Sequence, residues 1–435
     1  MLKLTQADFA VRRLELARKM GAHSIAIIAT NAVSYRNSDV DYKYRADSSF
    51  YYLTGFPEPE AIAVIQTFDD ADEYEYTLFC RERDPELEIW NGYREGLEGA
   101  KSAYHADASY AIDDFNEEVV ELLSHAHKVY FRVGHDADFD IRITSIIQQH
   151  HLKLSLLQLD PIVDVMRLIK SDKEIGLMKK AAEISALAHT KAMESVRNGM
   201  MEYELEAELN YVFGKHGCVP AYGSIVGSGE NGCILHYVEN NKKIEDGQLV
   251  LIDAGCEYEY YASDITRTFP VNGVFSKEQR IIYQLVLDAQ LAAIDAVRIG
   301  NPYRKPHDIV VRILTQGLLE LGLLQGNLED LIGDEAYRQF YMHGTGHWLG
   351  LDVHDVGGYK TKEGPRHYEA GMVVTIEPGI YISPQDTTVP EKWRGIGIRI
   401  EDDIVVTSEG PQVLTASVVK EIDHIEALMK STANK

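Results

Sequence analysis

Short apolar runs alternate with amphipathic stretches over the first 160 or so residues. Runs rich in β-branched and aromatic residues predict strands at residues 24–30, 60–66, 76–82 and 128–134. Helical spacing of apolar residues predicts helices at residues 1–20, 116–126 and 138–151. This alternation is typical of a small α/β domain. No strand is followed by G-x-G-x-x-G, so we expect no nucleotide site in this domain.

The pattern changes after LQLDPIVDVMRLIKS, near residues 160–172. We therefore predict two domains, residues 1–170 and residues 171–435. Ser171 and Glu174 form a capping-box pattern that begins a helix over residues 173–196. Later helices are predicted at residues 202–216, 277–298 and 306–322, and strands with a two-residue period separate them. The second domain is thus expected to be α+β, with a mixed, largely antiparallel sheet covered by helices.

Strand periodicity in the second domain predicts a charged face. In GIGIRIEDD the three isoleucines fall on one side of a strand, and Arg399, Glu401 and Asp403 fall on the other. Thr375 and Glu377 share a face in the same way. A guanidinium beside carboxylates would hold them ionised and oriented, so this face is expected to look into a polar cavity.

Length and charge limit the classes of function. The chain has 435 residues, 45% of them hydrophobic, which is enough for two domains with real cores. Its 43 Lys and Arg against 68 Asp and Glu give a formal charge of −25. Such a surface repels nucleic acid and anionic membranes, so neither is an expected partner. No stretch approaches the length of an apolar membrane span.

The cysteines and the first residues indicate a cytoplasmic location. Cys80, Cys218, Cys233 and Cys256 are scattered without a C-x-x-C pair, which favours a reducing compartment over a disulfide framework or a thiolate zinc site. The first twenty residues lack the unbroken apolar core of a signal peptide.

Five residues in the last 190 positions carry the candidate chemistry. Each follows a short apolar strand or lies in a Gly-rich turn: Asp253, Asp264, His347, Glu377 and Glu401. Four carboxylates at one point would raise each other's pKa, and two divalent cations would balance their charge. Carboxylates with one His suit Mn²⁺, Mg²⁺ or Co²⁺, and two ions roughly 3.5–4 Å apart can share a hydroxide and polarise a carbonyl. Asp264 and Glu401 are candidates for bridging them.

Three further histidines accompany this set: His236, His343 and His354. Two of them flank His347 in a stretch whose glycines, Gly344, Gly346 and Gly350, allow the backbone to approach a ligand closely. While one His binds metal, the others could donate hydrogen bonds to a developing oxyanion.

At these residues the chain resembles aminopeptidase P, the Xaa-Pro aminopeptidase family of the pita-bread metallopeptidases. The resemblance runs nearly end to end through YRNSDVDYKYRADSSFYYLTGFPEPEA, EIWNGYREG, IVGSGENGCILHY, DAGCEY, SDITRTFPVNG, HGTGHWLGLDVHD, TIEPGIYI and RGIGIRIEDD. It implies an N-terminal α/β domain for oligomerisation and substrate access, and a pita-bread domain that cleaves peptides with proline at the second position.

The resemblance also implies a role for each matched residue. It makes the five candidates the ligands of two Mn²⁺ ions, with Asp264 and Glu401 bridging, a metal-bridging hydroxide as nucleophile and Glu377 as proton acceptor. Residues that contact substrate, stabilise the intermediate or shuttle protons are His236, His343 and His354. Arg399 supports the ligands and Tyr381 lies in the same wall. Asp39 and Trp90 match residues that reach a neighbouring active site in a homotetramer, so we expect an oligomer, either tetramer or dimer.

Other enzymes and binding proteins share this fold. A prolidase restricted to Xaa-Pro dipeptides, which could also hydrolyse organophosphate esters, stays open because the segment 357–371, with Arg366, departs from the family pattern. A methionine aminopeptidase is disfavoured because those chains generally lack the N-terminal domain. A non-catalytic relative or a metal-free creatinase-like hydrolase is disfavoured because all five ligand positions are filled.

Overall fold

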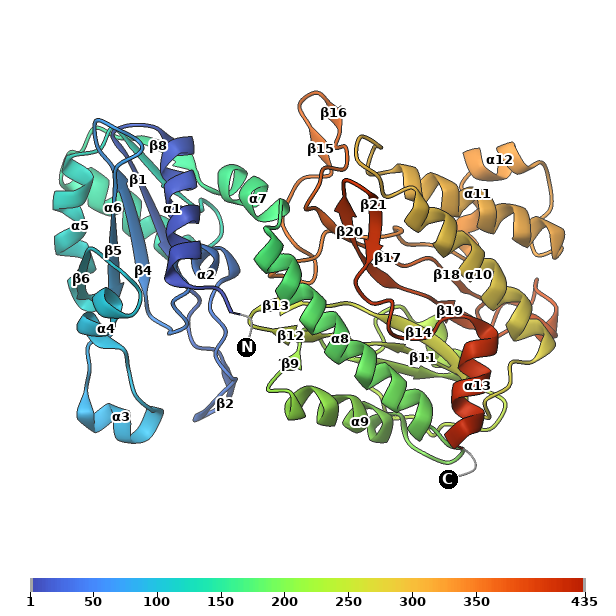
Figure 1. Cartoon of the computed structure of the whole chain (residues 1–435). Coiled ribbons are helices and arrows are strands. Elements are labelled where there is room, and N and C mark those ends of the chain that lie inside the picture. Colours follow the sequence, from blue (N-terminus) through green and yellow to red (C-terminus); the bar gives the residue numbers. More distant parts are fainter. Residues whose placement is uncertain (1–2, 433–435) are drawn as a thin grey trace. The chain divides into compact units, whose positions relative to one another are not determined.

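The computed structural model describes residues 3–432, which divide into two compact units, residues 3–167 and residues 168–432. Figure 1 colours the first unit from blue to teal and the second from green to red. The division falls inside helix α7 (Asp160–Leu168). The segment around Pro161 is therefore helical, and proline is tolerated there because it lies in the first turn, where its missing N–H would have no helical partner.

The first unit is an α/β domain built on a six-stranded mixed sheet. The order is β6-β5-β4-β1-β7-β8, with β4 antiparallel to β1 and β5, and the other pairs parallel. The strands are β1 (Ser24–Ala29), β4 (Ile62–Thr67), β5 (Tyr74–Cys80), β6 (Ala108–Ala111), β7 (Lys128–Phe131) and β8 (Ser155–Gln158), and a hairpin adds β2 (Tyr35–Asn37) and β3 (Val40–Asp41). The helices are α1 (Gln6–Met20), α2 (Ser48–Thr54), α3 (Pro85–Asn91), α4 (Gly96–Ser102), α5 (Phe115–Ser124) and α6 (Ala137–Gln149).

The four strands and three helices predicted for the first unit are confirmed, with residues 1–2 lying outside the described part. The alternation succeeds as a predictor because β1, β4 and β7 are buried and apolar, and because α5 and α6 cover them with one apolar face.

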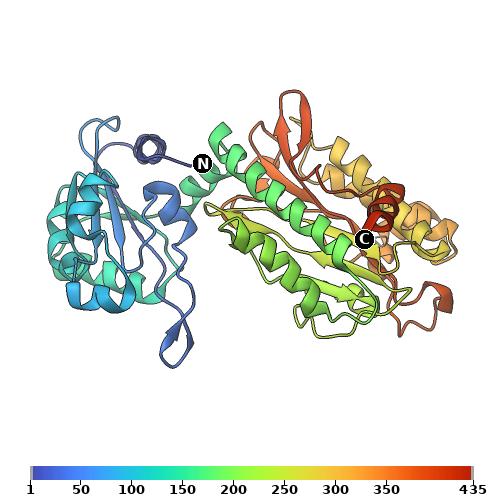
Figure 2. The same cartoon turned by 60° about the horizontal axis from the view of Figure 1, so that its bottom comes forward.

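The second unit consists of small antiparallel sheets between two helix pairs, as predicted. Its sheets are β10-β11-β14, β13-β12-β9, β17-β20-β21, β18-β19 and β15-β16. The helices α8 (Asp172–Ser195) and α9 (Glu202–Lys215) contact β9, β10, β12 and β13, whereas α10 (Lys277–Asp295) contacts β17, β18, β19 and β21, and α11 (Lys305–Glu320) packs on α10. In both views the strands run between the green pair and the yellow-to-orange pair (Figure 1 and Figure 2).

The strands of this unit are short: β9 (Val219–Pro220), β10 (Ile225–Ser228), β11 (Leu249–Asp253), β12 (Cys256–Tyr258), β13 (Tyr261–Ala262), β14 (Thr266–Pro270), β15 (Lys360–Thr361), β16 (Gly364–Pro365), β17 (Val373–Ile376), β18 (Gly379–Tyr381), β19 (Gly397–Arg399), β20 (Asp402–Thr407) and β21 (Gly410–Val413). Two further helices are α12 (Leu328–Gly333) and α13 (Ile422–Thr432). None of the helices within residues 3–432 is both long enough and apolar enough to traverse a bilayer.

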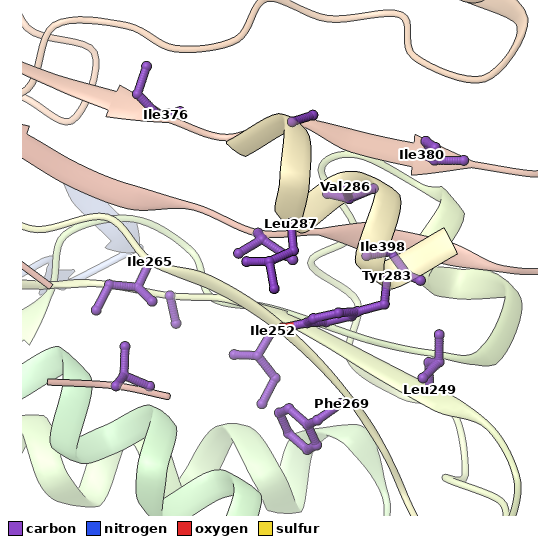
Figure 3. Packing of buried hydrophobic residues seen from close by; sticks show 14 of the residues in the cluster. Leu249, Ile252, Ile265, Phe269, Tyr283, Val286, Leu287, Ile376, Ile380 and Ile398 are labelled. Atoms are coloured by element: carbon purple, nitrogen blue, oxygen red, sulfur yellow. The ribbon is translucent and has the colours of Figure 1, made fainter. Parts of the chain in front are cut away.

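One apolar core joins helices and strands of the second unit. Figure 3 shows Tyr283 and Leu287 of α10 beside Ile252 of β11 and Ile398 of β19, all buried. The predicted capping box of α8 is present, with Ser171 Oγ accepting from Glu174 N and the Glu174 carboxylate accepting from Ser171 N at 2.9 Å. The core therefore holds the ends of β11, β14, β17 and β19 in place, where the candidate residues lie.

Candidate active site and metal centre

The five candidate ligands converge on one cavity of about 570 Å³ in the second unit. Asp253 ends β11, Asp264 lies two residues before β14, Glu377 directly follows β17, and Glu401 lies between β19 and β20. His347 comes from the irregular stretch that precedes β15. Four of the five candidate ligands thus lie at strand ends, which the core holds still, whereas His347 and further lining residues come from irregular segments.

Asp264, His347 and Glu401 form the tightest group, because one ligand atom from each lies within 4.8 Å of the other two. His347 Nε2 lies 3.5 Å from Asp264 Oδ2 and 3.6 Å from Glu377 Oε1. The other ring nitrogen, Nδ1, lies 3.0 Å from the Trp348 carbonyl oxygen and can donate to it. Once Nε2 has lost its proton, that bond leaves the Nε2 lone pair facing the carboxylates, which is how a His binds a metal ion.

Burial makes this acidic cluster costly without a cation. Burial raises the pKa of Asp253, raises that of Glu377 to about 7 and raises that of Glu401 well above its usual range. Burial also opposes ionisation of Asp264, but the hydrogen bond from His347 offsets it and lowers the Asp264 pKa. The donor set of carboxylate oxygens and one imidazole nitrogen fits hard divalent cations, whose charge would remove this cost.

Tyr222 is a site residue that the sequence did not predict. Its hydroxyl lies 2.7 Å from Asp253 Oδ1 and also contacts Asp264 Oδ1. Tyr222 lines the cavity and lies three residues before β10, whose first residue, Ile225, pairs with Asp253. The strand pairing therefore brings this phenol to the carboxylates, and no local spacing signals it.

Arg399 lines the cavity beside the carboxylates, on the side that strand periodicity predicts. It is only 3% exposed, and its guanidinium donates to Asp253 Oδ2 at 2.6 Å, to Thr266 Oγ1 at 3.0 Å and to the Tyr381 hydroxyl at 3.0 Å. Thr266 in turn donates to Glu401 Oε2 at 2.6 Å. One cation thus orients two candidate ligands, one directly and one through a hydroxyl.

The reverse side of the Glu401 strand holds a buried charge network. Asp402 points away from the cavity and accepts from Arg267 at 2.7 Å and from Lys420 at 2.7 Å, and Gln290 and Thr415 complete its contacts. Burial opposes ionisation of Asp402, but the two cations outweigh it and lower the Asp402 pKa. Arg267 also donates to the Glu401 carbonyl oxygen at 2.6 Å, so this network fixes the backbone that carries the ligand.

The three additional histidines all line the cavity. His343 Nε2 lies 2.8 Å from the Tyr381 hydroxyl, and burial lowers the His343 pKa to about 3. Neutral His343 can therefore accept from Tyr381 while Tyr381 accepts from Arg399. The His354 ring lies 4.1 Å from the His347 ring, and burial lowers its pKa as well. His236 also lines the cavity but is exposed.

The glycines of this stretch have a reason beyond the one predicted, although Gly344 and Gly346 do line the cavity. A Cβ at Gly346 would lie 1.8 Å from the Thr375 carbonyl oxygen, and one at Gly350 would lie 2.2 Å from Asp355 Oδ2, whereas Gly344 has open space. Two of the three glycines therefore make room for the protein's own packing. Gly346 lets the chain that carries His347 lie directly on β17.

Asp39 and Trp90 belong to the first unit and do not line the cavity. Asp39 lies in the turn between β2 and β3, and Trp90 lies on α3 with 84% of its surface exposed. The exposed residues Ile89 and Tyr93 are its neighbours. Their part in a neighbouring active site stays a prediction.

The segment 357–371 forms the β15–β16 hairpin and contributes none of the described residues that line the cavity. Arg366 donates through Nε to the Gly358 carbonyl oxygen at 2.5 Å, within the same segment. Tyr359 packs on Tyr303, with ring centroids 4.5 Å apart, and on Trp348. The hairpin is thus held against Tyr303 and against Trp348, the residue that follows His347.

Comparisons with known proteins agree over the whole length. The family model of metallopeptidase family M24 matches residues 176–408, and that of the aminopeptidase P N-terminal domain matches residues 9–130. A Xaa-Pro aminopeptidase of Escherichia coli is 47% identical over 99% of both chains. The structure of a Pseudomonas aeruginosa aminopeptidase matches with a TM-score of 0.97 and 49% identity, and a variant of E. coli aminopeptidase P in complex with substrate matches with 0.95 and 45%, each covering 100% of both chains.

Proposed function

The chain belongs to metallopeptidase family M24 and carries the aminopeptidase P N-terminal domain, and from this premise we propose that it hydrolyses the bond between the first residue and proline in peptides that begin Xaa-Pro. The observation that carries the proposal is the cavity in which all five candidate ligands meet. The full-length similarity to a Xaa-Pro aminopeptidase gives the substrate class. The enzyme class is therefore a metal-dependent exopeptidase.

The proposed ligands of two divalent cations, with Mn²⁺ as the expected ion, are Asp253, Asp264, His347, Glu377 and Glu401. When bound, such ions supply a hydroxide nucleophile and polarise the scissile carbonyl. Support comes from the donor chemistry and from the raised pKa values of the buried carboxylates, which cations would relieve.

Glu377 is the proposed proton acceptor. It lies beside His347 at 3.6 Å and His343 at 3.7 Å, and burial raises its pKa to about 7. A carboxylate with a pKa near the working pH can take a proton from the attacking water and return it to the leaving nitrogen. Burial and the nearby Arg399 charge lower the His343 pKa and keep the imidazole neutral, and the hydrogen bonds from Arg399 through Tyr381 fix its position.

His236, His343 and His354 are the proposed contacts for the substrate carbonyl and for the tetrahedral intermediate. They border the same cavity as Ile225, Leu235 and Val238, which give it an apolar side. The bond before proline has no N–H, and the ring fixes φ. A site that binds the free amino terminus at the metals and packs the ring against apolar side chains suits this substrate, because it needs no hydrogen bond from that amide.

We also propose that the protein works in the cytoplasm as a homotetramer in which Asp39 and Trp90 help to complete a neighbouring site. The exposed side chains of Leu87, Ile89, Trp90 and Tyr93 support an interface, because a group of large exposed apolar side chains is typical of an interaction surface. The four cysteines are free thiols, which suits a reducing compartment.

Product analysis tests the proposal. The Mn²⁺-loaded protein is given Ala-Pro and Ala-Pro-Ala-Ala side by side, and free Ala is measured. Release of Ala from the tetrapeptide is expected. Cleavage of the dipeptide alone would make the enzyme a prolidase. Cleavage of neither peptide, with two metals bound, would mean that the substrate class is wrong although the metal site is right.

A further inference from the structure

The segment between Ser228 and Lys242 forms the exposed wall of the cavity. It leaves β10, makes one 3-10 turn and continues without regular structure, and its residues Leu235, His236 and Val238 line the cavity. An irregular segment has few backbone bonds of its own to keep it still. Something else must hold His236 in place if it is to meet a substrate reproducibly.

The carboxylate of Glu202 fastens both ends of this segment. Glu202 is completely buried. Its Oε1 atom accepts from Ser228 N and Ser228 Oγ, both at 2.7 Å, and from Asn231 Nδ2 at 3.1 Å. Its Oε2 atom accepts from the Tyr237 hydroxyl at 2.7 Å and from Lys242 N at 2.8 Å. Five donors from one segment therefore meet on a single side chain.

The Glu202 carboxylate is surrounded by hydrogen-bond donors rather than by a cation. Within residues 3–432, no Lys, Arg or His is ion-paired with Glu202; the nearby Lys242 ammonium pairs with Glu230. Glu202 is the first residue of α9, where the helix dipole favours a negative charge. Burying a carboxylate without a cation is costly unless hydrogen bonds satisfy it, and the five donors do so only while the segment keeps this conformation.

Tyr237 connects this anchor to the active site. Its hydroxyl contacts Glu202, and its ring packs in a buried cluster with Ile225, Leu251 and Tyr381. Tyr381 in turn contacts His343 and Arg399. Because burial and the bond to Glu202 raise the Tyr237 pKa to about 12, the hydroxyl remains a donor at neutral pH. His236 is the adjacent residue in the chain, so its backbone position follows that of Tyr237.

We propose that Glu202 is a positioning residue that acts through Tyr237 to hold His236 in the substrate cavity. The inference rests on the proposed function for its kinetic consequence. Glu202 itself does not line the cavity, so it would act on substrate only through the segment it fastens.

Glu202→Gln is the test variant, because glutamine has the same shape but only one acceptor oxygen. In either orientation of the glutamine amide, the NH₂ group replaces one of the two acceptor oxygens and faces an N–H donor. Either Ser228 N or Lys242 N then loses its acceptor. In the metal-loaded full chain we expect kcat/KM on an Xaa-Pro peptide to fall about tenfold, since small misplacements of substrate contacts have effects of this order or larger. Metal content should not change. A kcat/KM within twofold of the unmodified protein would overturn the proposal.

A double-mutant cycle separates positioning from general stability. His236→Ala is measured alone and combined with Glu202→Gln. If Glu202 acts through His236, the Gln substitution should cost less than about twofold in the His236→Ala background. A full tenfold loss in both backgrounds would show that Glu202 acts elsewhere. If Glu202→Gln folds poorly, Tyr237→Phe, which removes only the hydroxyl, takes its place as the test variant. It should reproduce part of the loss in kcat/KM, and an unchanged kcat/KM would contradict the route through Tyr237.

Glu230→Gln is the matched control, because Glu230 lies in the same segment but is exposed and contacts only the Lys242 ammonium. Hydrogen–deuterium exchange of residues 229–242 supplies a readout that needs no substrate. Faster exchange is expected in Glu202→Gln and not in Glu230→Gln. If the unmodified protein cleaves no Xaa-Pro peptide, the proposed function fails while this exchange result still decides the anchoring role. Equal exchange in the two variants would overturn it.

Discussion

His347 Nε2 and Asp264 Oδ2 lie 3.5 Å apart, and each changes the protonation of the other. Burial alone would lower the His347 pKa, but the hydrogen bond to Asp264 and the nearby charge of Glu377 outweigh it and raise that pKa to about 9. In the metal-free protein His347 is therefore protonated at neutral pH. A histidine must lose its proton before it can bind a metal ion.

Metal affinity should consequently rise with pH. Between about pH 7 and 8.5 the loss of the His347 proton predicts up to about tenfold tighter binding per pH unit. Below pH 7 the slope should steepen, because Glu377, whose pKa is raised to about 7, also releases a proton. Calorimetric titration of the metal-free protein with Mn²⁺ in buffers of different ionisation enthalpy measures the protons released. An affinity independent of pH would contradict this coupling.

Asp264→Ala and Glu401→Ala should abolish metal content and activity together, with activity falling by about a thousandfold or more, since each would remove one ligand of the proposed metal site. Elemental analysis and Xaa-Pro hydrolysis are measured on the same preparations. Glu363→Ala, in the exposed β15–β16 turn, serves as the control and should change neither. A variant with normal metal and no activity would argue against the ligand role.

Arg399→Lys should lower kcat/KM by about ten- to a hundredfold while metal remains bound. A lysine carries one charged nitrogen and cannot serve Asp253, Thr266 and Tyr381 together. Steady-state kinetics and metal analysis check this expectation. Arg304→Lys is the matched control, because Arg304 is exposed and pairs only with Asp308. Unaltered kinetics in Arg399→Lys would show that the charge alone suffices.

His354→Ala should keep its metal and lose turnover by about a hundredfold, the usual scale for one proton-transfer or hydrogen-bonding group. His354 contacts the His347 ring without sharing its carboxylates, so the ligand set should survive. His367→Ala, an exposed histidine near the hairpin, is the comparison. An unchanged rate in His354→Ala would remove this residue from the mechanism.

Trp90→Ala should reduce activity only if subunits share sites. Sedimentation establishes the oligomeric state first, and kcat/KM is then compared above and below the dissociation concentration. Ile141→Ala, which is also exposed in the first unit, provides the control. Unaltered kinetics of Trp90→Ala in a confirmed oligomer would argue against sharing.

Strand periodicity accounts for what the sequence predicted well. The alternation in GIGIRIEDD placed Arg399, Glu401 and Asp403 on one side. Arg399 and Glu401 do line the cavity, whereas Asp403 is buried outside its lining and accepts from Asp264 N at 3.1 Å. Local alternation suffices there because the isoleucines on the other face are buried and fix the orientation of the strand. The convergence of all five candidate residues could be expected only from the charge balance and the family resemblance, because it depends on pairings between distant strands.

The features that the sequence did not predict depend on contacts between residues far apart in the chain. Tyr222 reaches Asp253 because β10 pairs with β11, which no spacing around Tyr222 reveals. Gly346 lines the cavity as expected, but the sequence did not reveal that it also lies against the Thr375 backbone. Glu202 is an ordinary helix-start residue in the sequence, and only tertiary structure gathers five donors on it.

Asp402 and its partners Arg267 and Lys420 have a consequence for how the enzyme is supplied with its ions. This network fixes the Glu401 backbone through bonds within the protein alone. The proposed metal site is therefore preorganised before any cation binds. We therefore expect the protein to lose and regain the proposed ions without refolding. Chelation should cost the enzyme its activity and lower its thermal stability, because the buried carboxylates lose the positive charge that balances them, but it should leave the fold intact.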